Sequence, residues 1–535
     1  MKKIFTILCL AAIGLTLSRC KDPLENVTLN ITGDVINYST VLQIEDGNGS
    51  PVNDIQVSIS GADGDHIYNM EGYKQFTVAE GTLVLGVDPS YEPTADRPTE
   101  FVVELRKSGY LTQKVPVTIS MQQAPAIIQV NMLDLNNLPI GVAVSIQTEA
   151  LVNNATTRDL VFQTRRENYA ERITTVRISR GTQFHEINGN LLEGSTLNST
   201  LITLDAAIPE ALAVFPGGSL IARGVRKTDG IHADGVFNPA AVSNIDFTVG
   251  GGEVRGFSQA INVAMEIDPA FTNLRTGGTV QAGDQLEIYS YNTGEGVWKY
   301  EQEVSVSSTD GQLVAEFETD HLTWYMVGNF VESCNTPSSF NLTGSWLQDN
   351  FNYPFTVRAL IGNRVITTLE ASIMTNNNTV VIPGLPASGI TIEVVRDGEV
   401  LASQAIDGAC GAATTINLTQ PVEGPTVSLQ LYVRCPIDNG IISYIPTFYV
   451  FYREPAGSSN DGWQLLGIAS NGFLNTTKLT AGNRYDFRAI WGSKTRTVLN
   501  RVVQETNEAV IGNGEGDIIP RDNALDFVAE NCGNQ

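Results

Sequence analysis

Apolar side chains alternate with polar ones over short stretches along most of this chain. Clear examples lie at residues 55–59, 115–119, 254–267 and 286–291. A period of two is typical of β-strands that bury one face, and glycine-rich turns separate these stretches. No long stretch of helical period stands out. The pattern therefore predicts an all-β fold of tandem, immunoglobulin-like β-sandwich modules.

The first residues combine a positive charge with an apolar run. Lys2 and Lys3 precede the apolar residues 4–17, and Cys20 follows shortly before an acidic segment. This layout is typical of an export signal, because the run is too short to span a membrane comfortably as a helix. We therefore expect residues 1–19 to be a signal peptide and the protein to be exported.

The residues Leu17-Ser18-Arg19-Cys20 resemble the end of a bacterial lipoprotein signal, with Arg19 standing where that pattern has a small residue. The resemblance implies that Cys20 is the lipidated first residue of the mature protein. Asp22 and Glu25 partly match the acidic surface-export signal of large lipoproteins of Bacteroidota, which the chain also resembles in style. It implies an outer-membrane location, with a lipid anchor and exposure at the cell surface.

Length and charge narrow the class of protein further. The 535 residues are enough for about three to five domains of ~100–200 residues each. The formal net charge is −25, and no basic run offsets it. Such a surface repels nucleic acid and anionic lipid headgroups, so we expect no nucleic-acid partner.

A turn cluster marks the first module. Asp46-Gly47-Asn48-Gly49-Ser50-Pro51-Val52 precedes the alternating residues 55–59, which predicts a hairpin. Together with the later Ser108-Gly109-Tyr110, the cluster resembles carboxypeptidase-regulatory-like sandwiches, which implies a spacer or interaction module. Alternate oxygen ligands of a calcium loop are the other interpretation of Asp46, Asn48 and Ser50. That loop would lack its distal acidic ligand, so we favour a turn.

One stretch carries candidate chemistry. His321-Leu322-Thr323, followed by aromatic residues, resembles the cleavage motif of autoproteolytic β-sandwich domains in adhesion-type receptors and in netrin-receptor and ankyrin relatives. The resemblance implies Thr323 as nucleophile, His321 as base and Leu322-Thr323 as the scissile bond. The alternative, which we favour, is a terminal strand that places Phe317, Thr319, His321 and Thr323 on one face.

The last module contains a local signature of its own. Residues 479–489 are similar to the tyrosine-corner region of fibronectin type III domains. This resemblance implies that the hydroxyl of Tyr485 caps a corner between strands, while Phe487 and Ala489 face the core.

Aromatic residues crowd one strand of the same module. Tyr449 and Phe451 lie on one face of the stretch 448–452, and Trp463 and Trp491 lie near it in sequence. One face fills the core, and the other is either covered or exposed. If exposed, these four aromatic residues could bind a glycan or a protein partner.

The cysteines fit an oxidising compartment. Apart from Cys9 in the signal peptide and Cys20, the chain has Cys334, Cys410, Cys435 and Cys532. Four cysteines allow three pairings, of which the local one joins Cys334 to Cys410 and Cys435 to Cys532. Each such bond would stabilise its module by roughly 4 kcal/mol.

These observations predict a signal peptide and four modules. The expected ranges are 1–19 for the signal peptide, 20–125 for the carboxypeptidase-regulatory-like sandwich, 126–332 for a larger sandwich, 333–420 for a small sandwich and 421–535 for the fibronectin III-like sandwich.

No pattern predicts an enzyme, a cofactor or a metal site, since the four histidines lack metal-ligand spacing and no nucleophile motif or phosphate loop is present. The sequence leaves open whether two of its many carboxylates form a catalytic pair of the glycosidase type. We expect a non-enzymatic surface lipoprotein that is a structural or binding component of an envelope complex, associated with a transporter or with assembly. The alternatives are a glycan-binding protein and an autoprocessing adhesin.

Overall fold

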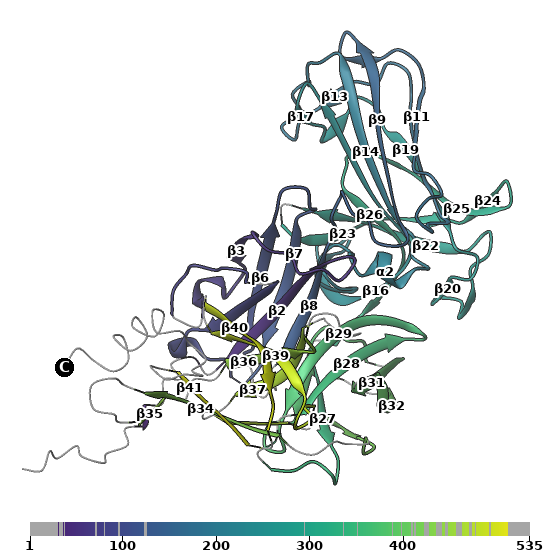
Figure 1. Ribbon diagram of the computed structural model, residues 1–535. Coiled ribbons are helices and arrows are strands. Elements are labelled where there is room, and N and C mark those ends of the chain that lie inside the picture. The colour runs from purple at the N-terminus through teal and green to yellow at the C-terminus, as the bar shows by residue number, and fades with distance from the viewer. Residues whose placement is uncertain are drawn as a thin grey trace, which may run out of the picture. The chain divides into compact units, whose positions relative to one another are not determined.

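The computed structural model describes residues 30–31, 36, 38–69, 72–79, 81–94, 97–121, 126–293, 295–334, 336–349, 351, 353–387, 389–396, 398–407, 410, 413–421, 427–434, 441–444, 448–455, 463–469, 473–476, 478–491, 494–504 and 506–511. Strands dominate these residues (Figure 1). Short helical turns occur at η2 (Gly64–His66), η3 (Pro89–Tyr91) and α2 (Pro209–Leu212). The predicted all-β class is confirmed.

The chain divides into two compact units. Residues 36–422 and 490–495 form one, called the large unit below. Among the described residues, 30–31 and those within 427–489 and 496–511 form the other, called the C-terminal unit.

An eight-stranded sheet runs through the large unit. In spatial order its strands are β32 (Glu399–Ile406), β31 (Ile390–Arg396), β28 (Tyr353–Ile361), β29 (Arg364–Ile373), β8 (Ala126–Met132), β2 (Ser39–Asp46), β5 (Thr82–Val87) and β4 (Ile67–Tyr68). β8 pairs in parallel with β2 and antiparallel with β29. Strands of the first and third expected modules therefore lie in one sheet, joined by β8 at the start of the second expected module. The expected module ranges themselves stay predictions.

A second layer covers the first part of this sheet. It consists of β3 (Gln56–Ser60), β6 (Thr99–Arg106) and β7 (Gln113–Ile119). Phe101, Val103 and Leu105 alternate along β6 and are buried, as expected for a strand with one face in a core. The predicted hairpin is confirmed only next to the turn, where Glu45 and Pro51 form an antiparallel bridge. Residues 55–59 are not its second strand, because β2 and β3 belong to different sheets.

The predicted turn after β2 is confirmed. The Oδ1 atom of Asp46 accepts hydrogen bonds from the backbone N–H groups of Asn48 and Ser50, both at 2.9 Å. A side chain that bonds its own backbone in this way stabilises a turn. The Asp46 carboxylate is thus engaged by the turn itself.

A nine-stranded sheet organises the next part of the large unit. Its strands are β10 (Ala155–Thr156), β9 (Val142–Val152), β14 (Thr196–Leu204), β16 (His232–Val249), β15 (Ile221–Arg226), β23 (Val297–Ser305), β22 (Gln285–Asn292), β26 (Trp324–Glu332) and β17 (Gly252–Glu253). The long β16 pairs with both β15 and β26. Because Arg226 of β15 also pairs with Lys299 of β23, five strands close into a ring.

A five-stranded sheet packs against the same region. It consists of β11 (Leu160–Gln163), β12 (Thr174–Ile178), β19 (Ile261–Ile267), β25 (Gln312–Thr319) and β24 (Ser307–Thr309). Small two-stranded sheets pair β13 (Phe184–His185) with β18 (Gly256–Phe257) and β20 (Thr272–Asn273) with β21 (Gly278–Thr279). β22 is buried on both faces: Leu286 and Ile288 enter the core between the two large sheets, and Tyr289 and Tyr291 enter a second core.

That second core is shared with the third expected module. The remaining strands of this module are β27 (Ser338–Thr343), β30 (Thr379–Ile382) and β33 (Ala413–Asn417). Phe237 and Trp298 from the ring belong to the same continuous core as Phe355 and Ile392. The large unit is therefore a fused body of three sandwiches: one sheet joins the first to the third, and one core joins the second to the third.

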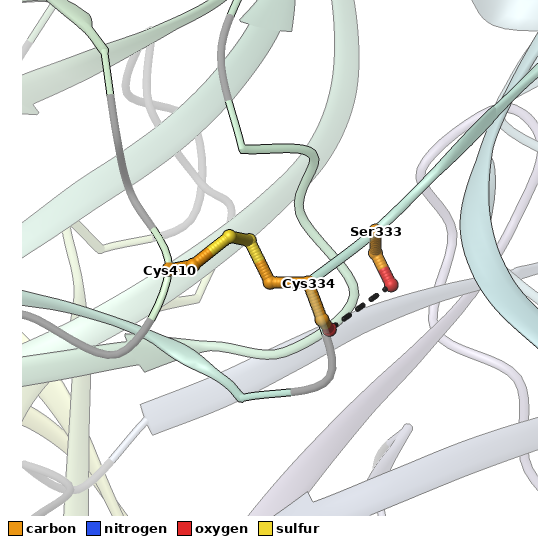
Figure 2. The surroundings of a disulfide bond; sticks show 3 residues. All are labelled: Ser333, Cys334 and Cys410. Carbon is orange, nitrogen blue, oxygen red and sulfur yellow. Dashed lines mark hydrogen bonds between the residues drawn. A yellow bond between two sulfur atoms is a disulfide. The ribbon is translucent and has the colours of Figure 1, made fainter.

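A disulfide bond fastens the beginning of the third module. Cys334 and Cys410 are bonded, with their Cα atoms 5.4 Å apart (Figure 2). The Ser333 hydroxyl donates to the Cys334 carbonyl at 3.3 Å. One of the two locally paired disulfides that the sequence predicts is thus present, whereas Cys435 and Cys532 lie outside the described residues.

The C-terminal unit is built on two sheets. One has the order β37 (Gln464–Ala469), β36 (Phe448–Arg453), β39 (Arg484–Trp491) and β40 (Lys494–Val502). The other has β1 (Asn30–Ile31), β35 (Ile441–Tyr444), β34 (Val427–Arg434) and β38 (Phe473–Thr476), and β41 (Thr506–Ile511) pairs with β34.

The predicted tyrosine corner is confirmed in this unit. Tyr485 is buried, and its hydroxyl accepts a hydrogen bond from the backbone N–H of Thr480 at 3.1 Å. The neighbouring expectation is wrong in part, because Phe487 and Ala489 are only half-buried. Arg488, on the other face of β39, is buried.

Candidate functional site

Several candidate residues lie outside the part of the chain that the structure describes. Cys20, Cys435 and Cys532 lie outside the described residues. Trp491 ends β39, but its side chain lies outside them too. Lipidation at Cys20 and the second disulfide stay predictions.

Of the two alternatives for the aromatic face of β36, the structure favours the covered one for its two central residues. Tyr449 and Phe451 are each 2% exposed, so neither ring is available to a ligand. Trp463 is half-buried, and the guanidinium carbons of Arg453 and Arg488 lie 4.7 and 3.9 Å from its ring centroid. Such contacts are cation–π interactions, which hold the indole in place and leave it a poor platform for stacking a sugar.

His321, Leu322 and Thr323 lie between two strands. β25 ends at Thr319 in the five-stranded sheet, and β26 begins at Trp324 in the nine-stranded sheet. The expected single strand through residues 317–323 is therefore interrupted, and the motif forms the link by which the chain crosses from one sheet to the other. Leu322 is buried in the core between these sheets, which fixes the link in place.

The His321 ring is held by two carboxylates. Its Nε2 atom lies 3.5 Å from Oε1 of Glu301, and its Nδ1 atom lies 3.0 Å from Oδ1 of Asp320. The contact with Glu301 raises the pKa of His321, and burial opposes this only in part. A histidine that retains its proton in this way is a poor general base.

Glu301 is the negative centre of this cluster. The hydroxyl of Ser290 donates to its Oε1 atom at 2.6 Å, and Nζ of Lys299 lies 3.2 Å away. Burial alone would raise the pKa of Glu301, but the bonds from His321 and Ser290 and the two nearby positive charges outweigh it and lower the pKa to about 2. Glu301 is therefore ionised at any physiological pH.

The Thr323 hydroxyl is not placed to act as a nucleophile. It donates to the backbone carbonyl of Tyr291, and the Thr323 carbonyl accepts from the N–H of Ile245 at 3.0 Å. Within the described residues no hydrogen bond joins the Thr323 hydroxyl to the His321 ring. The arrangement lacks the nucleophile–base contact that autoproteolysis needs, and it has the contacts of a structural corner.

Residues that the sequence reasoning did not single out complete this corner. Tyr325 is buried, and its hydroxyl donates to the His321 carbonyl at 2.6 Å and lies 2.7 Å from the Thr319 hydroxyl. Burial raises the pKa of Tyr325, so the phenol keeps the proton that it donates. The alternation of Thr319, His321 and Thr323 was visible in the sequence, but the contribution of Glu301 from β23 required the pairing of distant strands.

The other histidines occupy separate elements. His66 lies in η2, where its ring stacks on Tyr91 with centroids 3.5 Å apart, while His185 lies in β13 and His232 in β16. Among the described residues, no group of three or more His, Cys, Asp or Glu side chains is placed to hold a metal ion. In the same residues we find no helix with the length and apolar character needed to cross a bilayer.

Comparisons with known proteins add little to this picture. The sequence matches no protein-family model and no curated protein. Similar solved structures include the Bacillus anthracis TIE protein, at 8% identity over 86% of this chain and 58% of that chain, with a TM-score of 0.13. They also include the minor pilin GBS52 of Streptococcus agalactiae, at 11% identity over 34% of this chain and 97% of that chain, with a TM-score of 0.14.

The full-length major pilin RrgB of Streptococcus pneumoniae aligns at 8% identity over 88% of this chain and 99% of that chain, with a TM-score of 0.12. This chain thus spans 58% of the length of the TIE protein. TM-scores this low do not establish a common fold. The architecture described above rests on the strand pairing of the chain itself.

Proposed function

We propose that the chain is a non-enzymatic lipoprotein of the cell surface, tethered to the outer membrane through Cys20, and that it serves as a structural or binding component of an envelope complex. The observation that carries this proposal is the fusion of three sandwiches into one body, because the pairing of β8 with β29 joins the first to the third and a shared core joins the second to the third. A shared sheet and core resist bending between modules, which suits a rigid support.

The corner at His321 supports the non-enzymatic part of the proposal. Its candidate base is paired with Glu301, and its candidate nucleophile donates to a backbone carbonyl. These contacts leave neither group free for proton transfer or attack. The composition adds a second argument, because a strongly acidic surface keeps an exposed protein soluble and excludes nucleic acid.

Affinity purification from native membranes tests the proposal. The tagged full-length protein should fractionate with the outer membrane and bring down a membrane protein in constant ratio after mild cross-linking. A Cys20→Ser variant should leave the membrane fraction and lose that partner. Recovery of the unaltered protein from membranes without any partner would count against the envelope-complex role, and membrane retention of Cys20→Ser would count against the anchor.

A further inference from the structure

A groove of about 690 Å³ opens in the large unit where β8 and β29 separate. The two strands pair only through Ile128 with Leu369, and through the two residue pairs that follow on β29. Beyond this point Gln129 and Asn131 of β8 form one wall of the groove, and residues 364–368 of β29 form another. Residues of the segment that contains α2 also line the groove. The volume is that of a small-molecule site, for which about 300–1,000 Å³ is usual.

The guanidinium of Arg364 lies in the wall of this groove. Its Nη1 atom donates to Oδ1 of Asn238 at 2.9 Å and to the carbonyl of Pro239 at 2.7 Å, and Nη2 donates to the carbonyl of Ala206 at 3.1 Å. These bonds use three of the five N–H donors of an arginine and fix the plane of the guanidinium. Nε–H and one hydrogen of Nη2 are left without a partner in the described part of the chain.

Every acceptor of Arg364 is neutral. No carboxylate of the described residues lies within ion-pair distance of it. Burial lowers the pKa of Arg364 to about 10, and the more distant charge of Asp268 opposes this only in part. A half-buried cation that has no counter-ion in contact is a favourable place for an anion to bind.

The other charged groups of the groove are already paired. Asp268 lies 3.5 Å from Nη2 of Arg172. Arg223 lies 2.8 Å from Glu100 and 3.4 Å from Asp234. Arg364 is thus the charged residue of the groove that lacks an opposite charge at contact distance.

The remaining walls combine apolar residues with hydroxyl and amide residues. Leu220, Phe271 and Ile366 line the groove beside Arg364 and are buried. An apolar surface next to an unneutralised guanidinium fits a ligand with an apolar body and one anionic group.

We propose that this groove binds a small amphipathic ligand through an oxyanion group, a carboxylate, sulfonate or phosphate, which accepts hydrogen bonds from Nε and Nη2 of Arg364. The three bonds to neutral acceptors pre-orient the guanidinium, so the ligand meets a rigid pair of donors. The site is separate from the corner at His321 and does not depend on the structural role proposed above.

Calorimetric titration of the purified mature protein tests the site with benzoate, benzenesulfonate, phenyl phosphate and the neutral benzyl alcohol. At least one anion should bind with a stoichiometry of one, and benzyl alcohol should bind about 10-fold more weakly or worse. The anion that binds identifies the oxyanion class. Absence of saturable binding by all three anions would overturn the proposal.

Variants assign the binding to Arg364. Arg364→Met should weaken the anion about 10-fold or more and leave benzyl alcohol unaffected. The control Arg177→Met removes an arginine outside the groove and should change nothing. Equal anion affinity in Arg364→Met and in the unaltered protein would refute the assignment.

Because Arg364→Met also loses three hydrogen bonds, a second variant guards against misfolding. Thr368→Trp keeps the guanidinium and fills the groove from β29, so it should abolish binding of all four probes. Anion binding that survives Thr368→Trp would show that the anions bind elsewhere.

Discussion

The Nε2 atom of His321 lies 3.5 Å from a carboxylate oxygen of Glu301, across the point where the chain passes from β25 to β26. This pair converts a stretch that resembles a cleavage motif into a fixed corner. The pKa of His321 is raised above 6.5 and that of Glu301 is lowered from 4.5 to about 2. The stabilisation from His321 is therefore complete below about pH 6.5 and is lost as the pH rises through its folded pKa. The stabilisation from Glu301 is present above about pH 4.5 and is lost as the pH falls towards 2.

The pH range in which both His321 and Glu301 are charged gives the first prediction. His321→Asn should lower the midpoint of thermal unfolding more at about pH 5.5 than at about pH 8.5, since only the lower pH keeps the imidazolium that pairs with Glu301. Thermal scans of both proteins at the two pH values measure this. The exposed His232→Asn serves as the control and should show a smaller difference. An effect of His321→Asn that does not change with pH would contradict the ion pair.

The fusion of the modules predicts an unequal response at two glycines. Both Gly384 and Gly362 have positive φ angles, of 78° and 58°. A Cβ atom on Gly384 would lie 2.4 Å from Cγ2 of Ile221 in β15, whereas one on Gly362 meets nothing within 4 Å. Gly384→Ala should therefore reduce the free energy of unfolding by about 1–3 kcal/mol more than Gly362→Ala. Urea unfolding decides this, and equal losses would mean that Ile221 does not pack against this loop.

The disulfide predicts a response to reduction. Replacing both Cys334 and Cys410 by serine should lower the free energy of unfolding by up to roughly 4 kcal/mol, because the unfolded chain loses the constraint of a long closed loop. Unfolding in urea, with and without dithiothreitol, measures the effect. The unaltered protein should be weakened by the reductant to at least the level of the double variant. A double variant as stable as the oxidised protein would show that the bond adds nothing.

The tyrosine corner predicts the result of removing one hydroxyl. Tyr485→Phe leaves the backbone N–H of Thr480 without its acceptor and should cost about 1–2 kcal/mol of unfolding free energy. Tyr73→Phe removes a hydroxyl from a side chain that is 65% exposed and should be neutral. Urea titration followed by fluorescence compares the two variants, and an equal effect would argue against the corner.

Local features of this fold could be predicted from the sequence. Alternation predicted β3 and β7, and the resemblance of residues 479–489 to a tyrosine corner predicted the hydrogen bond of Tyr485, because both depend on residues close together in the chain. The turn at Asp46 was equally local. The predicted pairing of β2 with β3 was wrong because a turn specifies a change of direction and does not specify whether the next strand stays in the same sheet.

The pairing of strands that lie far apart in the chain could not be predicted from the sequence. The contact of Ile128 with Leu369 joins segments with a whole module between them, and neither strand contains a signal that specifies the other as its partner. The Arg364 groove was missed for the same reason, since its walls come from segments that lie far apart in the chain. The exposure of Tyr449 stayed open for a similar reason, because alternation shows that a strand has two faces without showing whether a second layer covers both.

The intact mass of the mature protein from native membranes tests the central claim most directly. A lipid-tethered, non-enzymatic chain predicts one species that begins with acylated Cys20 and continues uncut past Leu322. An unmodified first residue other than Cys20 would contradict the tether. A pair of fragments that end at Leu322 and begin at Thr323 would contradict the structural role of the His321 corner.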